Sequence, residues 1–322
     1  TSPWKVVGGD FMSLSATLRE RFPVDSAIES VLLGASSRRP IGTNVFDREW
    51  DLLIVLDACR HDALAALAPE FEFVDDVDAI YSVGSSTREW GANTFTARHR
   101  ERIEETAVVC SNAQLARTLE AGNAMESPLA RRFTSWDIVG PDAFHTFDSV
   151  SDYAPTDPFG GTSLPEIAVD RAIRLGRSTD AERMVVHLLP PHSPFRAAAI
   201  RENRPLEPEE FRPFDYLRDG GDRNRVRALY LDELRWGLEH VAVLLDNVDA
   251  ERAVVTADHG ELFGHLGLHS HPTGVPHPRL RRVPWLETTA TDTGSYEPRY
   301  EKPGQRHSRR RTAKQLEYLG YC

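Results

Sequence analysis

Short hydrophobic runs alternate with stretches of helical periodicity along most of the chain. Apolar runs of strand length occupy residues 50–57, 78–83, 106–110, 183–189 and 253–257. Helical patterns accompany them at residues 60–67, 112–119, 165–175 and 222–245. Buried runs of this length, separated by helices, are typical of parallel strands. The pattern therefore predicts an α/β fold in which a mainly parallel central sheet is sandwiched between helices.

The pattern also predicts how the chain is divided. We expect residues 1–45 to form an N-terminal helical segment packed on the core, residues 46–290 to form the α/β domain, and residues 291–322 to form a polar, basic tail with a short terminal helix. The first segment contains helix-like stretches at 12–22 and 25–33. Within the α/β domain, proline and polar residues break the periodicity at 152–162 and 197–213. Such breaks predict surface excursions rather than domain boundaries.

Composition narrows the class of protein. The 322 residues are 40% hydrophobic and 27% charged, and no apolar run approaches the length of a membrane-spanning helix. A net charge of −11 argues against nucleic-acid binding, which requires clustered positive charge. The three cysteines form no CxxC pair, which favours a reducing cytoplasm. Only three of the 38 basic residues are lysine, a bias that fits a GC-rich genome or a halophilic host. The chain starts at Thr1 without a leader, which fits a processed or truncated N-terminus.

Acidic residues follow two of the buried runs directly. Asp57 ends the first run, and Asp258 and His259 follow the last one. The carboxyl ends of parallel strands meet at one edge of a sheet, where ligands bind. A buried carboxylate is costly unless a cation receives it, and a divalent metal shared by these side chains would do so. The alternative for Asp258 and His259 is a helix cap beside a surface histidine.

Hydroxyl and imidazole groups fall at the same predicted edge. Residues 84–87 read Gly-Ser-Ser-Thr, and a nearby metal could lower the pKa of one hydroxyl and make it a nucleophile. The alternative for this turn is a plain helix cap. His187 lies near the end of another run and His192 in a proline-rich loop, so each could also be a structural histidine.

Together these residues resemble the alkaline phosphatase superfamily and, within it, the sulfatase-like branch. The resemblance runs from about residue 50 to the end of the chain, in order. The motifs that carry it are LDACRHDAL (56–64), GSSTREW (84–90), PPHSPF (190–195), VVTADHGELFGHLGLHSHP (254–272), RRVPW (281–285) and QLEYLGY (315–321).

The resemblance implies a divalent metal bound by Asp57, Asp258 and His259, together with Thr87, whose hydroxyl is the metal-activated nucleophile. A threonine occupies the corresponding place in the phosphoethanolamine and glycerol-phosphate transferases of this superfamily. The alternatives for the attacking hydroxyl are Ser86 and then Ser85.

The resemblance also implies that His192 is the histidine that faces the substrate, where it holds a phosphoryl oxygen or protonates the leaving group. His271 is the second candidate for substrate binding. A second metal, as in the two-metal phosphatases, would draw on His187, His192 and His271. His265 and His269 are further histidines downstream, and His269 and His271 are equally well explained as polar loop residues.

The departures from the family pattern limit the chemistry. Neither Cys59 nor Cys110 lies in the CxPxR motif of formylglycine sulfatases, so that mechanism is not expected. Where sulfatases carry paired aspartates, this chain has Asp57 followed by Ala58. Fewer oxygen ligands favour zinc or manganese over calcium or magnesium, which remain alternatives.

The expected activity is that of a metal-dependent hydrolase or transferase acting on phosphate esters, or on sulfate esters, through a Thr or Ser nucleophile and a covalent enzyme ester. The substrate would be a small molecule or a glycan or lipid ester. One alternative is a phosphoglycol-type transferase that modifies a surface glycan or lipid. Another is a non-catalytic relative that binds an anion in the inherited pocket. The oligomeric state is left open by the sequence.

Overall fold

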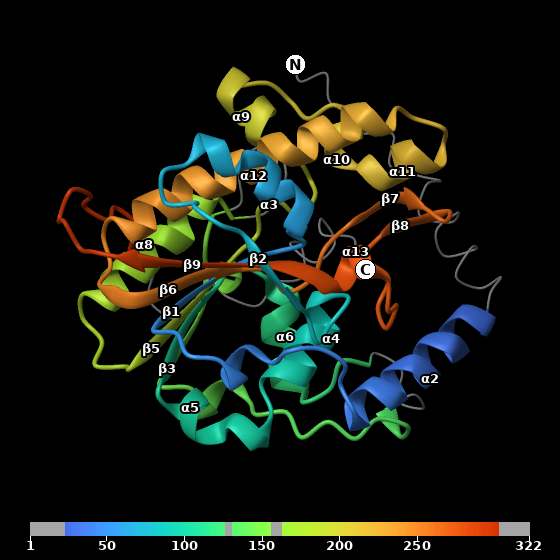
Figure 1. The fold of residues 1–322 in the computed structure, drawn as a ribbon, viewed down its shortest axis with the longest axis horizontal. Helices are drawn as coiled ribbons and strands as arrows, with labels where there is room; N and C mark the ends of the chain where they lie inside the picture. The colour runs from blue at the N-terminus through green and yellow to red at the C-terminus, as the bar shows by residue number, and fades with distance from the viewer. Residues whose placement is uncertain (1–22, 126–130, 156–162, 303–322) are drawn as a thin grey trace, which may run out of the picture.

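A seven-stranded sheet forms the centre of the protein in a computed structural model, which describes residues 23–125, 131–155 and 163–302 (Figure 1). The strands of this sheet are β1 (Leu52–Leu56), β2 (Asp78–Tyr81), β3 (Thr106–Cys110), β4 (Thr146–Ser149), β5 (Arg183–Leu188), β6 (Ala250–Thr256) and β9 (Arg282–Ala290). Their order is β2-β9-β6-β1-β5-β3-β4. The five strands from β6 to β4 pair in parallel, and β9 runs antiparallel to both of its neighbours. The predicted fold class is therefore confirmed.

Helices cover both faces of the sheet (Figure 1). One face carries α3 (His61–Leu67), α8 (Pro165–Gly176) and α12 (Arg223–Leu245). The other carries α4 (Thr87–Thr94), α5 (Arg100–Glu104) and α6 (Ala113–Ala121), with α2 (Pro23–Arg38) packed on α4. Short 3-10 helices lie at Val45–Asp47, Ala68–Glu70, Ala97–His99, Pro141–Ala143 and Val150–Asp152. In the described ranges no helix has both the length and the apolar composition needed to cross a membrane.

The middle of the sheet is the hydrophobic core. All five residues of β1 are buried, because β5 and β6 flank the strand and helices cover both of its faces. The register pairs Val55 of β1 with His187 of β5 and with Thr256 of β6. The carboxyl ends of these three strands therefore meet at one place in the sheet.

Local capping fixes where the helices at this edge begin. The Ser86 side chain accepts a hydrogen bond from the backbone of Glu89 and so caps α4. Asn112 accepts from the backbone amides of Gln114 and Leu115 and caps α6. Both caps lie on loops that leave the sheet at the carboxyl end of the parallel strands.

Several parts of the fold differ from the sequence prediction. Strands β4 and β9 were not predicted. Residues 197–213, expected as a surface excursion, form α9 (Ala197–Glu202) and α10 (Pro208–Phe211), and α11 (Pro213–Arg218) follows. Ala199 and Glu210 are fully buried there, because α9 and α10 pack against α12. The helix expected at 25–33 is part of α2, whereas the stretch at 12–22, residues 156–162 and the tail from 303 lie outside the described residues.

Candidate metal centre

Asp57 emerges from the core at the end of β1. Its backbone amide continues the ladder to the carbonyl of Leu188, and its side chain is fully buried. The next residue, Ala58, has a φ of 61°, so the chain turns sharply out of the strand. The Tyr230 hydroxyl of α12 fastens this turn by donating to the Ala58 carbonyl at 2.8 Å. The fold thus holds the Asp57 carboxylate at a fixed position.

Asp258 and His259 follow β6 and face Asp57. Asp258 Oδ1 accepts from the backbone amides of Ala58 at 3.1 Å and His259 at 2.8 Å. His259 Nδ1 must donate to the Gly260 carbonyl, 2.8 Å away, because a carbonyl can only accept. Its Nε2 then carries the lone pair and lies 3.5 Å from Asp57 Oδ1 and 3.4 Å from Asp258 Oδ2. This tautomer is the one that a metal ligand requires.

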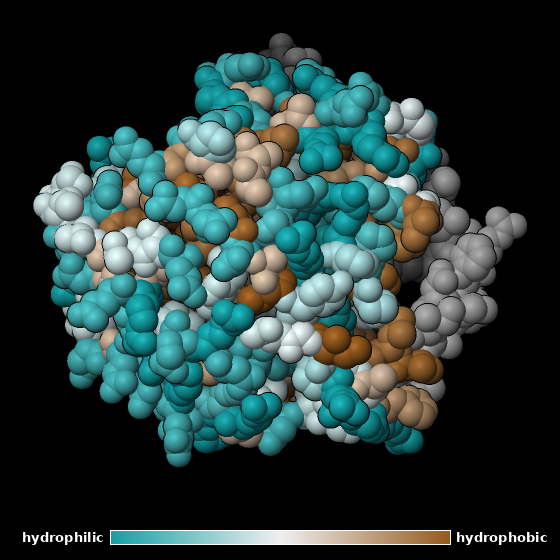
Figure 2. Space-filling view, in the orientation of Figure 1, coloured by the Kyte–Doolittle hydropathy of each residue, from teal (hydrophilic) through white to brown (hydrophobic). Residues whose placement is uncertain are grey.

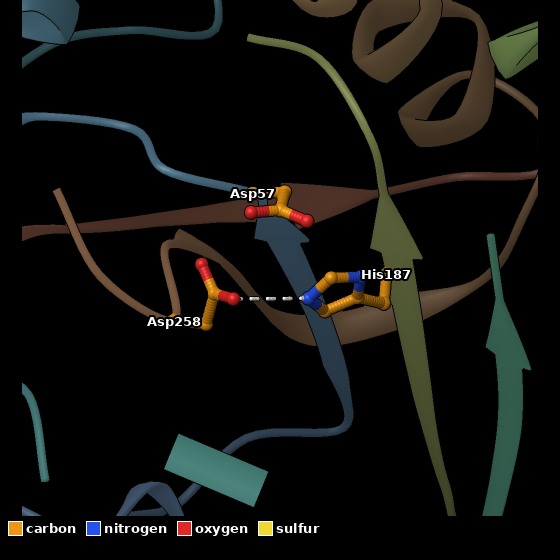
Figure 3. Close-up of side chains that lie close together, drawn as sticks. All are labelled: Asp57, His187 and Asp258. Carbon is orange, nitrogen blue, oxygen red and sulfur yellow. Dashed lines mark ion pairs between the residues drawn. The ribbon is translucent and has the colours of Figure 1, made fainter. Parts of the chain in front are cut away.

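His187 completes a group of three buried side chains with Asp57 and Asp258 (Figure 3). One potential ligand atom from each lies within 4.8 Å of the others, and His187 Nε2 is 3.5 Å from Asp258 Oδ2. The sequence analysis had grouped His187 with His192 and His271 as candidates for a second metal. The structure instead places it beside the first set of candidate ligands, because β5 and β6 both flank β1.

Thr87 is the hydroxyl residue that reaches this cluster. Its Oγ1 donates to Asp258 Oδ2 at 2.8 Å and lies 3.3 Å from His259 Nε2. The other two hydroxyls of the turn point elsewhere. Ser85 Oγ lies 3.0 Å from both Glu89 Oε2 and the Pro272 carbonyl oxygen, and Ser86 caps α4.

The strand that precedes this turn is not a neighbour of β1. The sequence analysis placed the hydroxyl turn at the same edge of the sheet as Asp57, and in the structure β9 and β6 separate β2 from β1. The turn crosses that distance because β2 pairs with β9, and the Ser82 hydroxyl then donates to the Asp258 carbonyl. The hydroxyl therefore approaches the site from the edge of the sheet.

Asn112 is a site residue that the sequence analysis missed. Its Nδ2 donates to Asp57 Oδ2 at 2.5 Å and to Thr87 Oγ1 at 3.3 Å, while its Oδ1 caps α6. One amide side chain thus links the carboxylate, the hydroxyl and a helix. Its position two residues after a buried strand was the available signal, but a helix cap explained that position fully.

The electrostatics of the cluster favour a cation. Burial, and then the charge of Asp258, raise the pKa of Asp57 well above its usual range. Burial lowers the pKa of His259 to about 4, so this imidazole is uncharged at neutral pH. Two carboxylates therefore face each other in the protein interior with an uncharged imidazole beside them. A divalent ion would relieve this repulsion.

The donor set fits such an ion. Asp57 Oδ1 and both ring nitrogens of His187 are buried, and none of these atoms has a hydrogen-bond partner among the described residues. Buried polar atoms are normally paired, so unpaired ones indicate that a further group belongs there. Two carboxylates and one or two imidazoles, with a hydroxyl alongside, are ligands that suit zinc or manganese.

A row of imidazoles extends from this cluster. The His259 ring lies 4.5 Å from the His271 ring, which lies 5.0 Å from the His192 ring, measured between centroids. Glu261 Oε2 is 3.0 Å from His271 Nδ1, and burial raises the pKa of this carboxyl to about 7. Burial lowers the pKa of His271 to about 3. The predicted substrate-facing histidines are therefore next to the candidate metal ligands, and Glu261, which was not predicted, holds one of them.

The remaining predicted histidines lie apart from the cluster. His265 ends β7 (Leu262–His265), and His269 lies on β8 (Leu268–Ser270), in a two-stranded hairpin. Both are partly exposed, and the His265 ring contacts His277 rather than the candidate ligands.

No family model and no curated protein matches the chain. Solved structures are similar to it at low identity. They include the integral membrane lipooligosaccharide phosphoethanolamine transferase A of Neisseria meningitidis, at 13% identity and a TM-score of 0.49, covering 80% of this chain and 50% of that one. This chain therefore spans half the length of that transferase.

Two further similar structures cover more of the other chain. The C-terminal periplasmic domain of phosphoethanolamine transferase EptC from Campylobacter jejuni has 16% identity and a TM-score of 0.45, covering 74% of this chain and 79% of that one. A protein in the alkaline phosphatase superfamily from Vibrio parahaemolyticus has 14% identity and a TM-score of 0.41, covering 87% and 71%. These are the kinds of protein that the motifs of the sequence resemble.

Proposed function

We propose that this protein is a metal-dependent enzyme that transfers or hydrolyses phosphate esters, with Thr87 as the nucleophile. The observation that carries the proposal is the position of the Thr87 hydroxyl, which is fully buried and hydrogen-bonded within a cluster of two carboxylates and two imidazoles. A threonine that only capped a helix would not need these partners. Ser86 already supplies the cap of α4.

Asp57, Asp258 and His259 would hold the ion, with His187 as a further donor beside them. A bound divalent cation would lower the pKa of a nearby hydroxyl and neutralise charge on phosphoryl oxygens. The protein's own contribution is to hold the nucleophile in place. Asn112 donates to both Thr87 and Asp57, so it keeps the hydroxyl beside the carboxylate.

The reaction forms a bond between Thr87 Oγ1 and phosphorus while the bond from phosphorus to the leaving oxygen breaks. Asp258 Oδ2, 2.8 Å from Thr87 Oγ1, is the acceptor within reach of the hydroxyl proton, because the lone pair of His259 Nε2 would be used by the ion. His192 would give a proton to the leaving oxygen. Water or an alcohol then displaces Thr87 from phosphorus, which makes the protein a hydrolase or a transferase, respectively.

Elemental analysis of protein purified without chelator tests this proposal, in the wild type and in Asp258→Ala. We expect about one or two equivalents of zinc or manganese in the wild type and none in the variant. The matched control is Asp219→Ala, an exposed aspartate that should leave the metal content unchanged. Absence of metal from the wild type, even after reconstitution, would contradict the proposal.

Turnover assays then separate the substrate classes. Aryl phosphate monoesters, phosphodiesters and sulfate esters would be compared, each with and without an added acceptor alcohol. Faster cleavage of the phosphate esters than of the sulfate ester is expected. Turnover that appears only when an alcohol is present would identify a transferase.

A further inference from the structure

Three arginines gather around one carboxylate on the outer side of the turn that joins β6 to β7, and a fourth lies nearby. Arg60 precedes α3, Arg223 and Arg227 lie on α12, and Arg279 lies on α13 (Pro278–Arg281). Together with Asp62 of α3, we call these residues the arginine cluster. Figure 1 shows α3, α12 and α13 converging beside the β7–β8 hairpin, and the surface over them is largely hydrophilic in Figure 2.

Asp62 Oδ2 lies near three of these arginines but is within hydrogen-bond distance of only one of them. Arg60 binds Asp62 with two hydrogen bonds, Nε to Oδ1 at 2.7 Å and Nη2 to Oδ2 at 2.5 Å. Arg227 Nη2 and Arg279 Nη1 are both 3.6 Å from the same Oδ2, which is beyond hydrogen-bond distance. Neither of these two guanidinium groups donates a hydrogen bond to any residue that the structure describes. Their donors face solvent, because the two side chains are 48% and 43% exposed.

The surroundings of the cluster carry further positive potential. Burial, and then Arg279, Arg60 and Arg223, lower the pKa of His265 to about 4. Its Nδ1 is buried without a hydrogen-bond partner among the described residues. The Arg223 guanidinium lies against the hairpin, where it donates to the Gly264 carbonyl at 3.2 Å. Such a concentration of positive charge is unexpected in a chain with a net charge of −11.

Guanidinium groups match the geometry and charge of phosphate oxygens, which they bind through paired hydrogen bonds. Within the cluster a single carboxylate faces three arginines, with Arg223 nearby, so the positive charges outnumber the negative one. We propose that Arg227 and Arg279, supported by Arg60 and Arg223, bind the phosphate group of a ligand at a site separate from the metal centre. No bond of the ligand is made or broken there.

The test uses inorganic pyrophosphate and the Asp258→Ala protein, in which the metal centre is disabled. Calorimetric titration should detect pyrophosphate binding to the protein that carries Asp258→Ala as its only substitution. Adding Arg227→Gln and Arg279→Gln should weaken it about tenfold or more, because charge-assisted hydrogen bonds are lost. Adding Arg98→Gln, at an arginine that is 76% exposed and paired with Asp47, should change nothing.

Three outcomes would overturn the proposal: no binding in Asp258→Ala, equal binding with and without Arg227→Gln and Arg279→Gln, or an equal loss in the Arg98→Gln control. The metal content of the wild type is measured separately, so failure of this site and failure of the proposed enzyme can be distinguished.

The same variants identify the source of the phosphate. One source of the phosphate is a lipid headgroup, because the apolar side chain of Leu266 at the tip of the hairpin is 89% exposed and could contact a lipid surface. The other source is a soluble phosphate ester. A lipid is supported if the protein sediments with vesicles that contain phosphatidylglycerol but not with pure phosphatidylcholine vesicles, and if Arg227→Gln with Arg279→Gln abolishes this sedimentation. Pyrophosphate binding without vesicle binding would support the soluble ester. Vesicle binding that persists in the protein with Arg227→Gln and Arg279→Gln would count against the cluster.

Discussion

The cluster of candidate metal ligands and the arginine cluster lie on opposite sides of the turn after β6 but differ in burial and in charge. Asp57, Asp258 and His259 are fully buried and bring carboxylates together. Arg227 and Arg279 are about half exposed and bring cations together. Water screens the arginines from one another but cannot screen the buried carboxylates. Each buried group therefore depends on its partners, whereas each exposed arginine keeps its donors for other ligands.

Arg60 connects the two clusters. Its guanidinium pairs with Asp62 on the outer side and donates from Nη1 to the Glu261 carbonyl, 3.3 Å away, on the inner side. The residue itself is buried, with 3% of its surface exposed. The buried and the exposed cluster are thus separated by the side chain of Arg60. We expect substitutions in the buried cluster to have larger effects on activity and stability than substitutions in the exposed one.

The largest effect is expected for Thr87→Ala. Turnover of the best phosphate ester should fall about a thousandfold or more, because the variant lacks the attacking oxygen. The matched control Ser86→Ala removes a neighbouring hydroxyl that only caps α4, so its turnover should stay within about tenfold of wild type. Steady-state kinetics on both variants make the comparison. Wild-type turnover in Thr87→Ala with loss in Ser86→Ala would assign the nucleophile to Ser86.

Acid should destabilise the protein through its buried imidazoles. The pKa is about 4 for His259 and about 3 for His271, below the ordinary value near 6.5. The unfolded chain therefore binds more protons than the folded one in this range, so stability is lost as pH falls from about 6.5 toward 4. Glu261 opposes this loss, because its pKa is raised to about 7 in the folded state. These three groups together predict a loss of about 3 kcal/mol between pH 7 and pH 4.

Urea unfolding in the presence of chelator, from pH 7 to pH 4, measures this loss. The variant Glu261→Gln removes the opposing group, so its loss of stability with acid should be about twice that of the wild type. Equal pH dependence in the two proteins would show that Glu261 is not protonated in the folded state. His145→Gln, at a histidine outside the site, is the control for an added glutamine.

The sequence predicted the candidate ligands where a local pattern was enough. Asp57 and Asp258 both follow apolar runs, and parallel strands bring their carboxyl ends to one edge whatever their order. The order itself was not predictable in this way. Strand β9 contains Pro284 and continues into the polar residues Glu287, Thr288 and Thr289, so it does not resemble the buried parallel strands. Its insertion between β2 and β6 is what brings the Thr87 turn to the site from the edge of the sheet.

Residues with two roles were the ones missed. Asn112 satisfies the rule for a helix cap, and nothing in its neighbours along the chain indicates that its amide also reaches Asp57. The position of His187 depends on register, because its pairing opposite Val55 sets which ligands it faces. Contacts between distant strands decide both cases, and a pattern along one segment does not contain them.

Substitution of Asn112 should reduce turnover less than substitution of Thr87, because Asn112 positions Thr87 and Asp57 rather than reacting itself. Asn112→Ala should lower turnover about ten- to a hundredfold, because Thr87 and Asp57 lose a shared donor. It should also destabilise the protein by about 1 kcal/mol through loss of the α6 cap. Asn112→Ser keeps a capping oxygen but lacks the amide group that reaches Asp57 and Thr87, so it should lose turnover but keep stability. Loss of stability without loss of turnover in Asn112→Ala would limit the residue to capping.

The smallest effect on folding is expected on the exposed side. Arg227→Gln and Arg279→Gln each remove a solvated ion pair with Asp62 and should change the free energy of unfolding by no more than about 1 kcal/mol. The matched buried variant is Arg281→Gln, because Arg281 donates to the buried Glu89 at 2.7 Å. Breaking that pair leaves a buried carboxylate without its partner and should cost about 3 kcal/mol or more. Chemical denaturation of the three variants measures the contrast. A cost in Arg227→Gln or Arg279→Gln as large as that in Arg281→Gln would mean that the arginine cluster holds the fold together rather than keeping its donors free for a ligand.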